Sequence, residues 1–144
     1  MGLGADDKEA VRELFSRYAW GYDCRDYEAV GETFLPDGVL IGPEGPLSGR
    51  AAIQAWMHAH VQEHHADKVM QHHIDHLLIE GDETRCRAQS YWTVIVHYGD
   101  GSCGVGSLGW YDDTLVKLDG QWFFEERRFN LDMPDRAPWR GRPS

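Results

Sequence analysis

Apolar residues recur with helical spacing in the first half of the chain. Between about residues 6 and 22 every third or fourth position is apolar, which predicts an amphipathic helix with one buried stripe. The stripe comprises Val11, Leu14, Phe15, Tyr18, Ala19 and Tyr22. Asp26 is a suitable N-cap for a short second helix, whose apolar face comprises Tyr27, Val30 and Phe34. Ser48 is the expected cap of a third helix, which buries Ile53, Trp56, Met57 and Val61.

Two shorter features separate the second and third predicted helices. Residues 35–38 have the composition of a turn, and residues 39–41 form a short apolar strand. Residues 42–46 contain two glycines and two prolines, so we expect a loop there.

From about residue 68 the pattern changes to that of strands. Four segments are rich in β-branched and aromatic residues, and turns that contain glycine separate them: 69–79, 85–98, 102–117 and 121–131. Helices followed by a long antiparallel meander predict an α+β fold, with the helices on one face of a curved sheet. We expect one domain over residues 1–132 and an irregular arm over residues 133–144, which contain three prolines and three arginines.

Composition and charge narrow the class of protein. The chain has 144 residues, 42% of them hydrophobic, and six tryptophans, which is enough for a packed core. Its formal net charge of −10 argues against nucleic acid and anionic membranes as partners, because both need a basic surface. No segment approaches a membrane span and the N-terminus lacks signal-peptide features, so we expect a cytoplasmic location. The cysteines, Cys24, Cys86 and Cys103, are expected to be reduced and mostly buried.

Asp23 lies at the predicted end of the first helix, beside its apolar stripe. A carboxylate is costly to bury without a partner, so we expect Asp23 to meet a cation in a polar pocket. The first long strand offers histidines, and alternation places His72 and His76 on one face and His73 on the other. Asp23 and one of them could form a dyad, in which the carboxylate fixes the tautomer and the imidazole moves a proton near neutral pH. The alternative is a histidine-rich strand with one satisfied core histidine.

Metal binding is a weaker interpretation of the histidines. The segment from His60 to His64 matches the H-x-x-E-H zinc-protease pattern, but the catalytic domain expected around that pattern is absent from this short chain. Strand alternation also separates His72 from His73 across the sheet. We therefore predict no metal and no other cofactor.

Further polar and aromatic residues could line a binding pocket. His97 ends the second long strand, and Tyr111 and Asp113 share one face of the third. Arg127 is one of two adjacent arginines in the last strand, and one of the two must point inward unless a bulge intervenes. An inward arginine either neutralises a buried acid such as Asp113 or binds substrate. The aromatic content, which includes Trp56, exceeds what a small core needs and could line a pocket for a ring-bearing ligand.

Short motifs in consistent order resemble the NTF2-like superfamily, in its SnoaL-like branch, over roughly residues 6 to 130. They are Tyr18-x-x-x-Tyr22-Asp23-x-x-Asp26-Tyr27, Gly49-Arg50-x-x-Ile53, Gln71-His72-His73-Ile74 and Gly109-x-Tyr111-x-Asp113, followed by Lys117 to Trp122 and Arg127. The resemblance implies a cone-shaped α+β barrel, in which a curved mixed sheet wraps around a pocket and three N-terminal helices cover it. Scytalone dehydratase, bile-acid 7α-dehydratase and the hexachlorocyclohexane dehydrochlorinase look like the nearest enzymes. In these enzymes an aspartate from the first helical region works with a strand histidine on an elimination.

Carried over to this chain, the resemblance implies catalytic roles for Asp23 and His72, or for His73 if the register shifts by one. Tyr22 and Tyr18 match tyrosines near the aspartate of the dehydratases. The second catalytic histidine of scytalone dehydratase falls near Gly106, so that role is empty here or passes to His97. The acid that the middle strand contributes in the bile-acid enzyme falls near Val94 and is missing here. The residues expected to contact substrate are His73, His76, His97, Trp56, Tyr111, Asp113 and Arg127.

The sequence therefore predicts a cofactor-independent lyase of the dehydratase type, or an isomerase, acting on a small apolar cyclic substrate. Two alternatives share the fold: a non-catalytic ligand-binding or assembly module, and a polyketide-type cyclase. An exposed sheet face in such folds usually pairs with another copy, so the resemblance also implies a homodimer or homotrimer.

Overall fold

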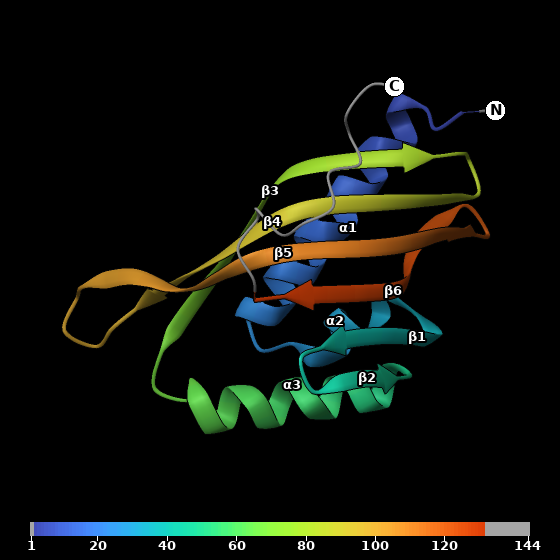
Figure 1. The fold of residues 1–144 in the computed structure, drawn as a ribbon. Coiled ribbons are helices and arrows are strands. Elements are labelled where there is room, and N and C mark those ends of the chain that lie inside the picture. The colour runs from blue at the N-terminus through green and yellow to red at the C-terminus, as the bar shows by residue number, and fades with distance from the viewer. Residues whose placement is uncertain (1, 132–144) are drawn as a thin grey trace.

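The computed structural model describes residues 2–131, which form three helices followed or joined by six strands (Figure 1). The elements are α1 (Ala5–Asp23), α2 (Tyr27–Glu32), β1 (Phe34–Gly42), β2 (Gly45–Ser48), α3 (Arg50–His64), β3 (Val69–Gly81), β4 (Arg85–His97), β5 (Cys103–Leu118) and β6 (Gln121–Asn130). The predicted α+β class is confirmed, and the long strands follow the helices as expected. The predicted arm over residues 133–144 lies outside the described residues.

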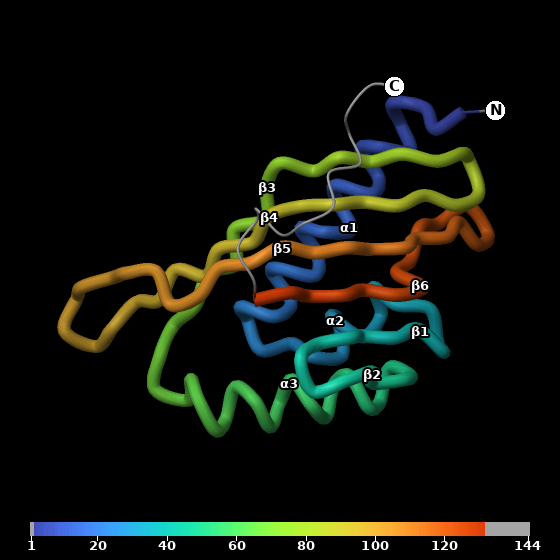
Figure 2. The backbone as a smooth tube through the Cα atoms, in the orientation of Figure 1, coloured from blue at the N-terminus to red at the C-terminus, as the bar shows by residue number. Residues whose placement is uncertain are grey.

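The strands form one open, mixed sheet with the order β2-β1-β6-β5-β4-β3. Strands β3 to β6 are an antiparallel meander, whereas β1 pairs with β6 in parallel. The sheet curves without closing, so β2 and β3 are its edges (Figure 1). Helix α1 crosses one face, called the inner face below, and α3 runs beside β1 and β2 (Figures 1 and 2). The cone is therefore open along one side.

The buried stripe of α1, which repeats every 3.6 residues, packs against the inward side chains of the sheet, which repeat every two residues. The predicted stripe of α1 is buried, and so are the inward residues of β4, which are Cys86, Ala88, Ser90, Trp92, Val94 and Val96. The rings of Phe15 and Phe34 lie 5.3 and 5.4 Å from that of Phe124 on β6, which joins α1, β1 and β6 in one core. This aromatic packing holds α1 against the sheet.

Several local predictions are wrong because long-range pairing overrides local spacing. Residues 35–38, expected to form a turn, lie within β1, and Gly45 and Pro46, expected in a loop, begin β2. Phe34 does not close the second helix but begins β1, where it pairs with Phe124; the Phe124 N–H donates to the carbonyl of Thr33 at 2.9 Å. Gly49, rather than Ser48, is the N-cap of α3. Its φ of 90° suits glycine, and Ser48 is already the last residue of β2.

A bulge interrupts β3 between Asp75 and Leu78. His76 lies inside it with a φ of 52°, and its exposed ring packs edge-on against Tyr91 at 5.5 Å. Tyr91 belongs to the outer face, since its neighbour Trp92 is buried on the inner one. The prediction that His76 shares a face with His72 is therefore wrong, because an extra residue in a strand ends its regular alternation.

Candidate functional site

The C-terminal end of α1 fixes the position of Asp23. The Asp26 N–H donates to the Gly21 carbonyl at 2.8 Å, and the Arg25 N–H donates to the Tyr22 carbonyl at 3.0 Å, a pattern that closes many helices. Arg25 takes the left-handed position of this motif with a φ of 60°. Glycine is usual there, because the conformation costs a residue with a Cβ about 1–2 kcal/mol. Asp23 is thus held as the last residue of the helix.

Asp23 makes two contacts with His72 on β3. Its Oδ1 lies 2.6 Å from the imidazole Nδ1, and its Oδ2 accepts a hydrogen bond from the His72 backbone N–H at 2.9 Å. An ionised carboxylate can only accept, so beside it a neutral imidazole carries its proton on Nδ1 and presents a lone pair on Nε2. The side chains of His72 and Asp23 are 8% and 18% exposed, so the pair is not sealed from solvent. The structure places His72, and not His73, opposite Asp23.

Three tyrosines extend from this pair into the core. The ring of Tyr22 lies 4.4 Å from the His72 imidazole, that of Tyr18 lies 6.1 Å from Tyr22, and that of Tyr111 lies 6.2 Å from Tyr18. Burial raises the pKa of all three phenols above the ordinary value. These tyrosines therefore remain protonated around neutral pH and can donate hydrogen bonds.

Arg127 and Asp113 form a fully buried ion pair on the inner face. They are cross-strand partners on β6 and β5, both 0% exposed, with Nε and Oδ1 3.6 Å apart. The guanidinium carbon lies 3.5 Å from the ring centre of Tyr111 and 4.2 Å from that of Tyr18, which adds cation–π attraction. This placement fits the neutralising role expected of an inward arginine. Contact of either residue with substrate stays a prediction.

Three predicted binding histidines lie away from the pair. His73 and His97 are exposed on the outer face, where the Nε2 of His97 is 3.4 Å from Oε1 of Gln71. His76 is turned outward by the bulge in β3. The structure therefore brings Asp23 together with His72 but with none of these three histidines.

The remaining predicted residue, Trp56, belongs to a cluster of rings on α3. It stacks on His60 at 4.9 Å and packs against Phe129 of β6 at 5.8 Å. The rings of His60, His64 and His65 lie 4.8–6.2 Å apart, and burial lowers the pKa of His60 and His65. Within residues 2–131, no group of three or more His, Cys, Asp or Glu is placed to hold a metal ion.

Arg25 links the end of α1 to the connection between α3 and β3, a contact that the sequence pattern did not reveal. Its Nη2 donates to the carbonyls of His65, Ala66 and Lys68 at 3.0, 3.2 and 2.9 Å. The available signal was a helix that ends without glycine at the position where glycine is usual.

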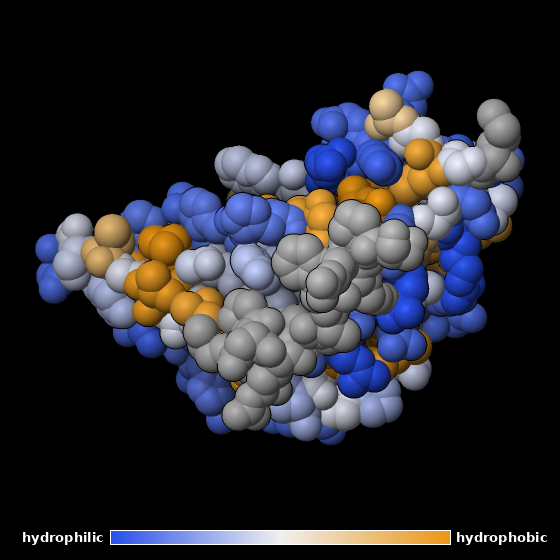
Figure 3. All heavy atoms as spheres, turned by 45° about the horizontal axis from the view of Figure 1, so that its top comes forward, coloured by the Kyte–Doolittle hydropathy of each residue, from blue (hydrophilic) through white to orange (hydrophobic). Residues whose placement is uncertain are grey.

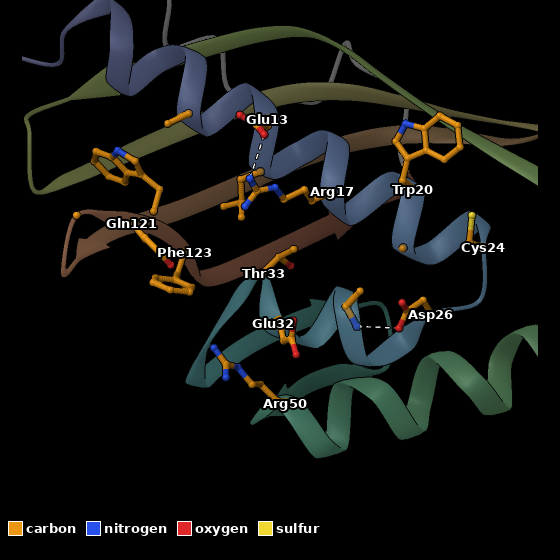
Figure 4. A pocket seen from close by; sticks show the side chains of 16 residues that line it. Glu13, Arg17, Trp20, Cys24, Asp26, Glu32, Thr33, Arg50, Gln121 and Phe123 are labelled. Atoms are coloured by element: carbon orange, nitrogen blue, oxygen red, sulfur yellow. Dashed lines mark hydrogen bonds and ion pairs between the residues drawn. The ribbon is translucent and has the colours of Figure 1, made fainter.

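A groove of about 770 Å³ lies on another side of α1 (Figure 4). It runs between α1, α2 and the start of β6, and it contains the ion pair of Arg17 with Glu13 and the cap made by Asp26 on α2. Neither Asp23 nor His72 lines it. The groove is therefore separate from the acid–imidazole pair.

All three cysteines are free thiols, but only Cys86 is buried. The expectation that most are buried is wrong, because Cys24 follows the end of α1 and Cys103 begins β5 at the hairpin turn, both on the surface. Burial raises the pKa of the Cys86 thiol to about 12, so this thiol is not a nucleophile at neutral pH. None of the helices within residues 2–131 combines the length and the hydropathy that crossing a membrane requires.

Comparison with known proteins supports the fold. A family model for the SnoaL-like domain matches residues 4–128. A protein of unknown function with a cystatin-like fold from Nostoc punctiforme is 26% identical, with a TM-score of 0.81, over 93% of this chain and 97% of that one. A Catenulispora acidiphila protein in complex with S-DNPA is 26% identical, with a TM-score of 0.77, over 88% and 95%. A candidate scytalone dehydratase from Novosphingobium aromaticivorans is 24% identical, with a TM-score of 0.74, over 96% and 95%. No curated protein matches the chain.

Proposed function

Because the chain belongs to the family of SnoaL-like domains, we propose that it is a cofactor-independent lyase of the dehydratase type, or an isomerase, that works through Asp23 and His72. The family assignment confirms the resemblance seen in the sequence motifs. The NTF2-like fold supports several activities, so the argument for function rests on the site itself.

The observation that carries the proposal is the double contact between Asp23 and His72. One carboxylate oxygen holds the ring nitrogen at 2.6 Å, and the other holds the backbone N–H of the same residue at 2.9 Å. The ring is thereby fixed in the tautomer whose Nε2 accepts a proton, and the carboxylate stabilises the imidazolium that then forms. This is the arrangement that a general base acting near neutral pH requires.

In the proposed elimination, Nε2 of His72 removes a proton from carbon. The released electron pair forms the new double bond as the bond from the neighbouring carbon to oxygen breaks. Tyr22, whose buried phenol stays protonated, donates a hydrogen bond to the departing oxygen. The imidazolium returns its proton to that oxygen, so that water leaves. In an isomerisation the same proton would return to a different carbon.

We propose a small apolar ring system as the substrate. The inner-face neighbours of His72 include Met70, Trp92 and Val94, each less than a tenth exposed, and His72 pairs directly with Val94 across the sheet. Apolar surroundings favour a hydrophobic ligand and strengthen the electrostatic effect of the dyad by excluding water. The complex of the Catenulispora acidiphila protein with S-DNPA shows that a similar fold can hold a small molecule.

Deuterium exchange tests the proposed proton abstraction. A panel of small cyclic ketones and hydroxyketones is incubated with the protein in D2O and followed by NMR. We expect the wild-type protein to incorporate deuterium at an activated carbon or to form an alkene, and His72→Ala to do neither. His58→Ala, which removes an exposed histidine of α3, is the matched control and should behave as wild type. Equal exchange by wild type and His72→Ala would contradict the proposal.

A non-catalytic ligand-binding or assembly module is the second candidate. It is favoured by the packing of the cone, because Tyr18, Tyr111, Arg127 and Phe124 are buried together between α1 and the sheet. In that case the dyad would be a structural pair, and the exchange experiment would find no activity in either protein. A polyketide-type cyclase differs from the first proposal only in its substrate.

We also propose that the outer face pairs with a second copy of the chain. The β4–β5 hairpin projects beyond the helices (Figures 1 and 2), and hydrophobic side chains gather at this end of the molecule (Figure 3). Tyr91, Val105 and Leu108 are 43%, 58% and 40% exposed, and the strand register places all three on the outer face. Exposed apolar surface of this kind is typical of an interface.

Val105→Glu is expected to weaken this association, because it places a charge inside the apolar contact. Light scattering coupled to size exclusion should give twice the 16.4 kDa chain mass for the wild type and one chain mass for the variant. Ser16→Glu, on the exposed side of α1, is the control and should leave the mass unchanged. A variant with the wild-type mass would exclude this surface, and a wild type of three chain masses would favour the homotrimer.

A further inference from the structure

Arg25 joins two segments whose meeting point is the dyad. Its side chain extends from the residue after the α1 cap to the connection between α3 and β3. There one nitrogen donates to three backbone carbonyls within four residues, those of His65, Ala66 and Lys68. Asp23 lies two residues before Arg25, and His72 lies four residues after Lys68. We infer that Arg25 is a positioning residue, which sets the distance between Asp23 and His72 by holding the start of β3 against the end of α1.

Within residues 2–131, the other hydrogen bonds of this connection reach only nearby residues of the chain. The Lys68 N–H donates to the His65 carbonyl at 3.1 Å and the Lys68 Nζ donates to the His64 carbonyl at 3.2 Å, but both bonds are local. Arg25 supplies the contacts that cross from this connection to a different element. The three carbonyls share the two hydrogens of one charged nitrogen, and hydrogen bonds from a charged donor are stronger than neutral ones. Arg25 therefore adds a direct link between the end of α1 and the segment that precedes β3.

The conformation of Arg25 supports a role beyond closing the helix. Its φ of 60° is one that glycine adopts without strain, and glycine would make the same two backbone bonds that close α1. An arginine at this position violates the local preference, and such a violation is expected where the side chain contributes something that glycine lacks. The contribution visible here is the set of bonds to the α3–β3 connection.

This inference rests on the proposed function for its catalytic meaning, but its structural test does not need a substrate. Arg25→Gly keeps the helix ending and removes the hydrogen bonds to the α3–β3 connection. Arg25→Met removes the same donors but keeps a side chain of similar length. Arg25→Lys keeps a charged donor. Arg12→Met, on an exposed position of α1, is the control for loss of one positive charge. The readouts are the hydrogen-exchange rate of the His72 backbone amide, the downfield proton signal of Nδ1–H, and Tm.

We expect Arg25→Gly and Arg25→Met to speed exchange of the His72 amide about tenfold or more, and to broaden or shift the Nδ1–H signal, because local opening would separate β3 from Asp23. Arg25→Lys should recover part of both signals, and Arg12→Met should resemble wild type. Arg25→Gly should do this without a matching loss in Tm, since glycine suits the helix end. Wild-type exchange and ring signals in both Arg25→Gly and Arg25→Met would overturn the inference.

The kinetic consequence separates this inference from the proposed function. On an identified substrate, Arg25→Gly should lower kcat about tenfold and change KM little, because the effect acts on the dyad and not on the binding surface. If the amide and ring signals change in the Arg25 variants while His72→Ala keeps full turnover, the positioning role of Arg25 is supported and the proposed function fails. If the signals do not change while His72→Ala is inactive, the positioning role of Arg25 is excluded and the proposed function is supported.

Discussion

His72→Ala and Asp23→Asn are each expected to lower kcat by about 10²–10⁴, the usual contribution of a well-placed acid/base group. Alanine removes the imidazole that Asp23 contacts. Asparagine keeps a similar shape and can still accept one hydrogen bond, but it lacks the negative charge that stabilises the imidazolium. Steady-state kinetics on a substrate identified by the exchange experiment provide the measurement.

The double variant discriminates between a dyad and two independent groups. If Asp23 acts through His72, combining the two substitutions should cost little more than the larger single loss, because both remove one working unit. Circular dichroism and Tm should show that each variant is folded. Single variants that retain full turnover, or losses that multiply in the double variant, would rule out the dyad mechanism.

The largest effect on stability is expected from Asp113→Asn. The substitution leaves the guanidinium of Arg127 buried without its counter-charge, 0% exposed among aromatic rings. Breaking a buried pair from one side costs about 3–5 kcal/mol, which should lower Tm by roughly 10 °C in a chain of this size. Urea unfolding and calorimetry measure the two quantities.

Removing both charges is the matched comparison. In Asp113→Leu combined with Arg127→Met, the region is apolar and no unpaired charge remains, so most of the stability lost in Asp113→Asn should return. Thr114→Val, at a half-buried neighbour on the other face of β5, controls for a change in strand propensity. If Asp113→Asn unfolds at the wild-type denaturant concentration, the pair contributes nothing and another group must balance Arg127.

The parts of the site predicted from sequence are those set by local periodicity. Asp23 ends a stripe of helical spacing, and His72 lies in the regular part of a long strand, where alternation separates it from His73. The choice of His72 as the partner of Asp23 came from the family resemblance. Alternation left open which of Arg127 and Arg128 points inward. The register shift between β5 and β6 decides it, because β6 buries Phe124 and then Arg127, three positions later. Asp23 and His72 lie where the repeat of their own element places them, since the bulge in β3 comes only after Asp75.

The parts that escaped prediction depend on contacts between distant segments. His76 lies in a bulge whose register is set by β4, and Phe34 joins β1 because β6 offers a parallel partner. Neither partner is visible in the local sequence. Arg25 belongs to the same class, because its role depends on carbonyls some forty residues later. The sequence shows only that glycine is missing where a helix ends.

The contact between Asp23 and the His72 amide has a consequence for the solubility of the fold. β3 is an edge strand, and an exposed edge offers free N–H groups on which another chain can build a further strand. The His72 N–H is occupied by Oδ2 of Asp23 and so is withdrawn from such pairing. The carboxylate thereby makes edge-to-edge aggregation through this N–H less favourable. The same side chain thus orients the imidazole and protects the edge strand that carries it from pairing with another chain.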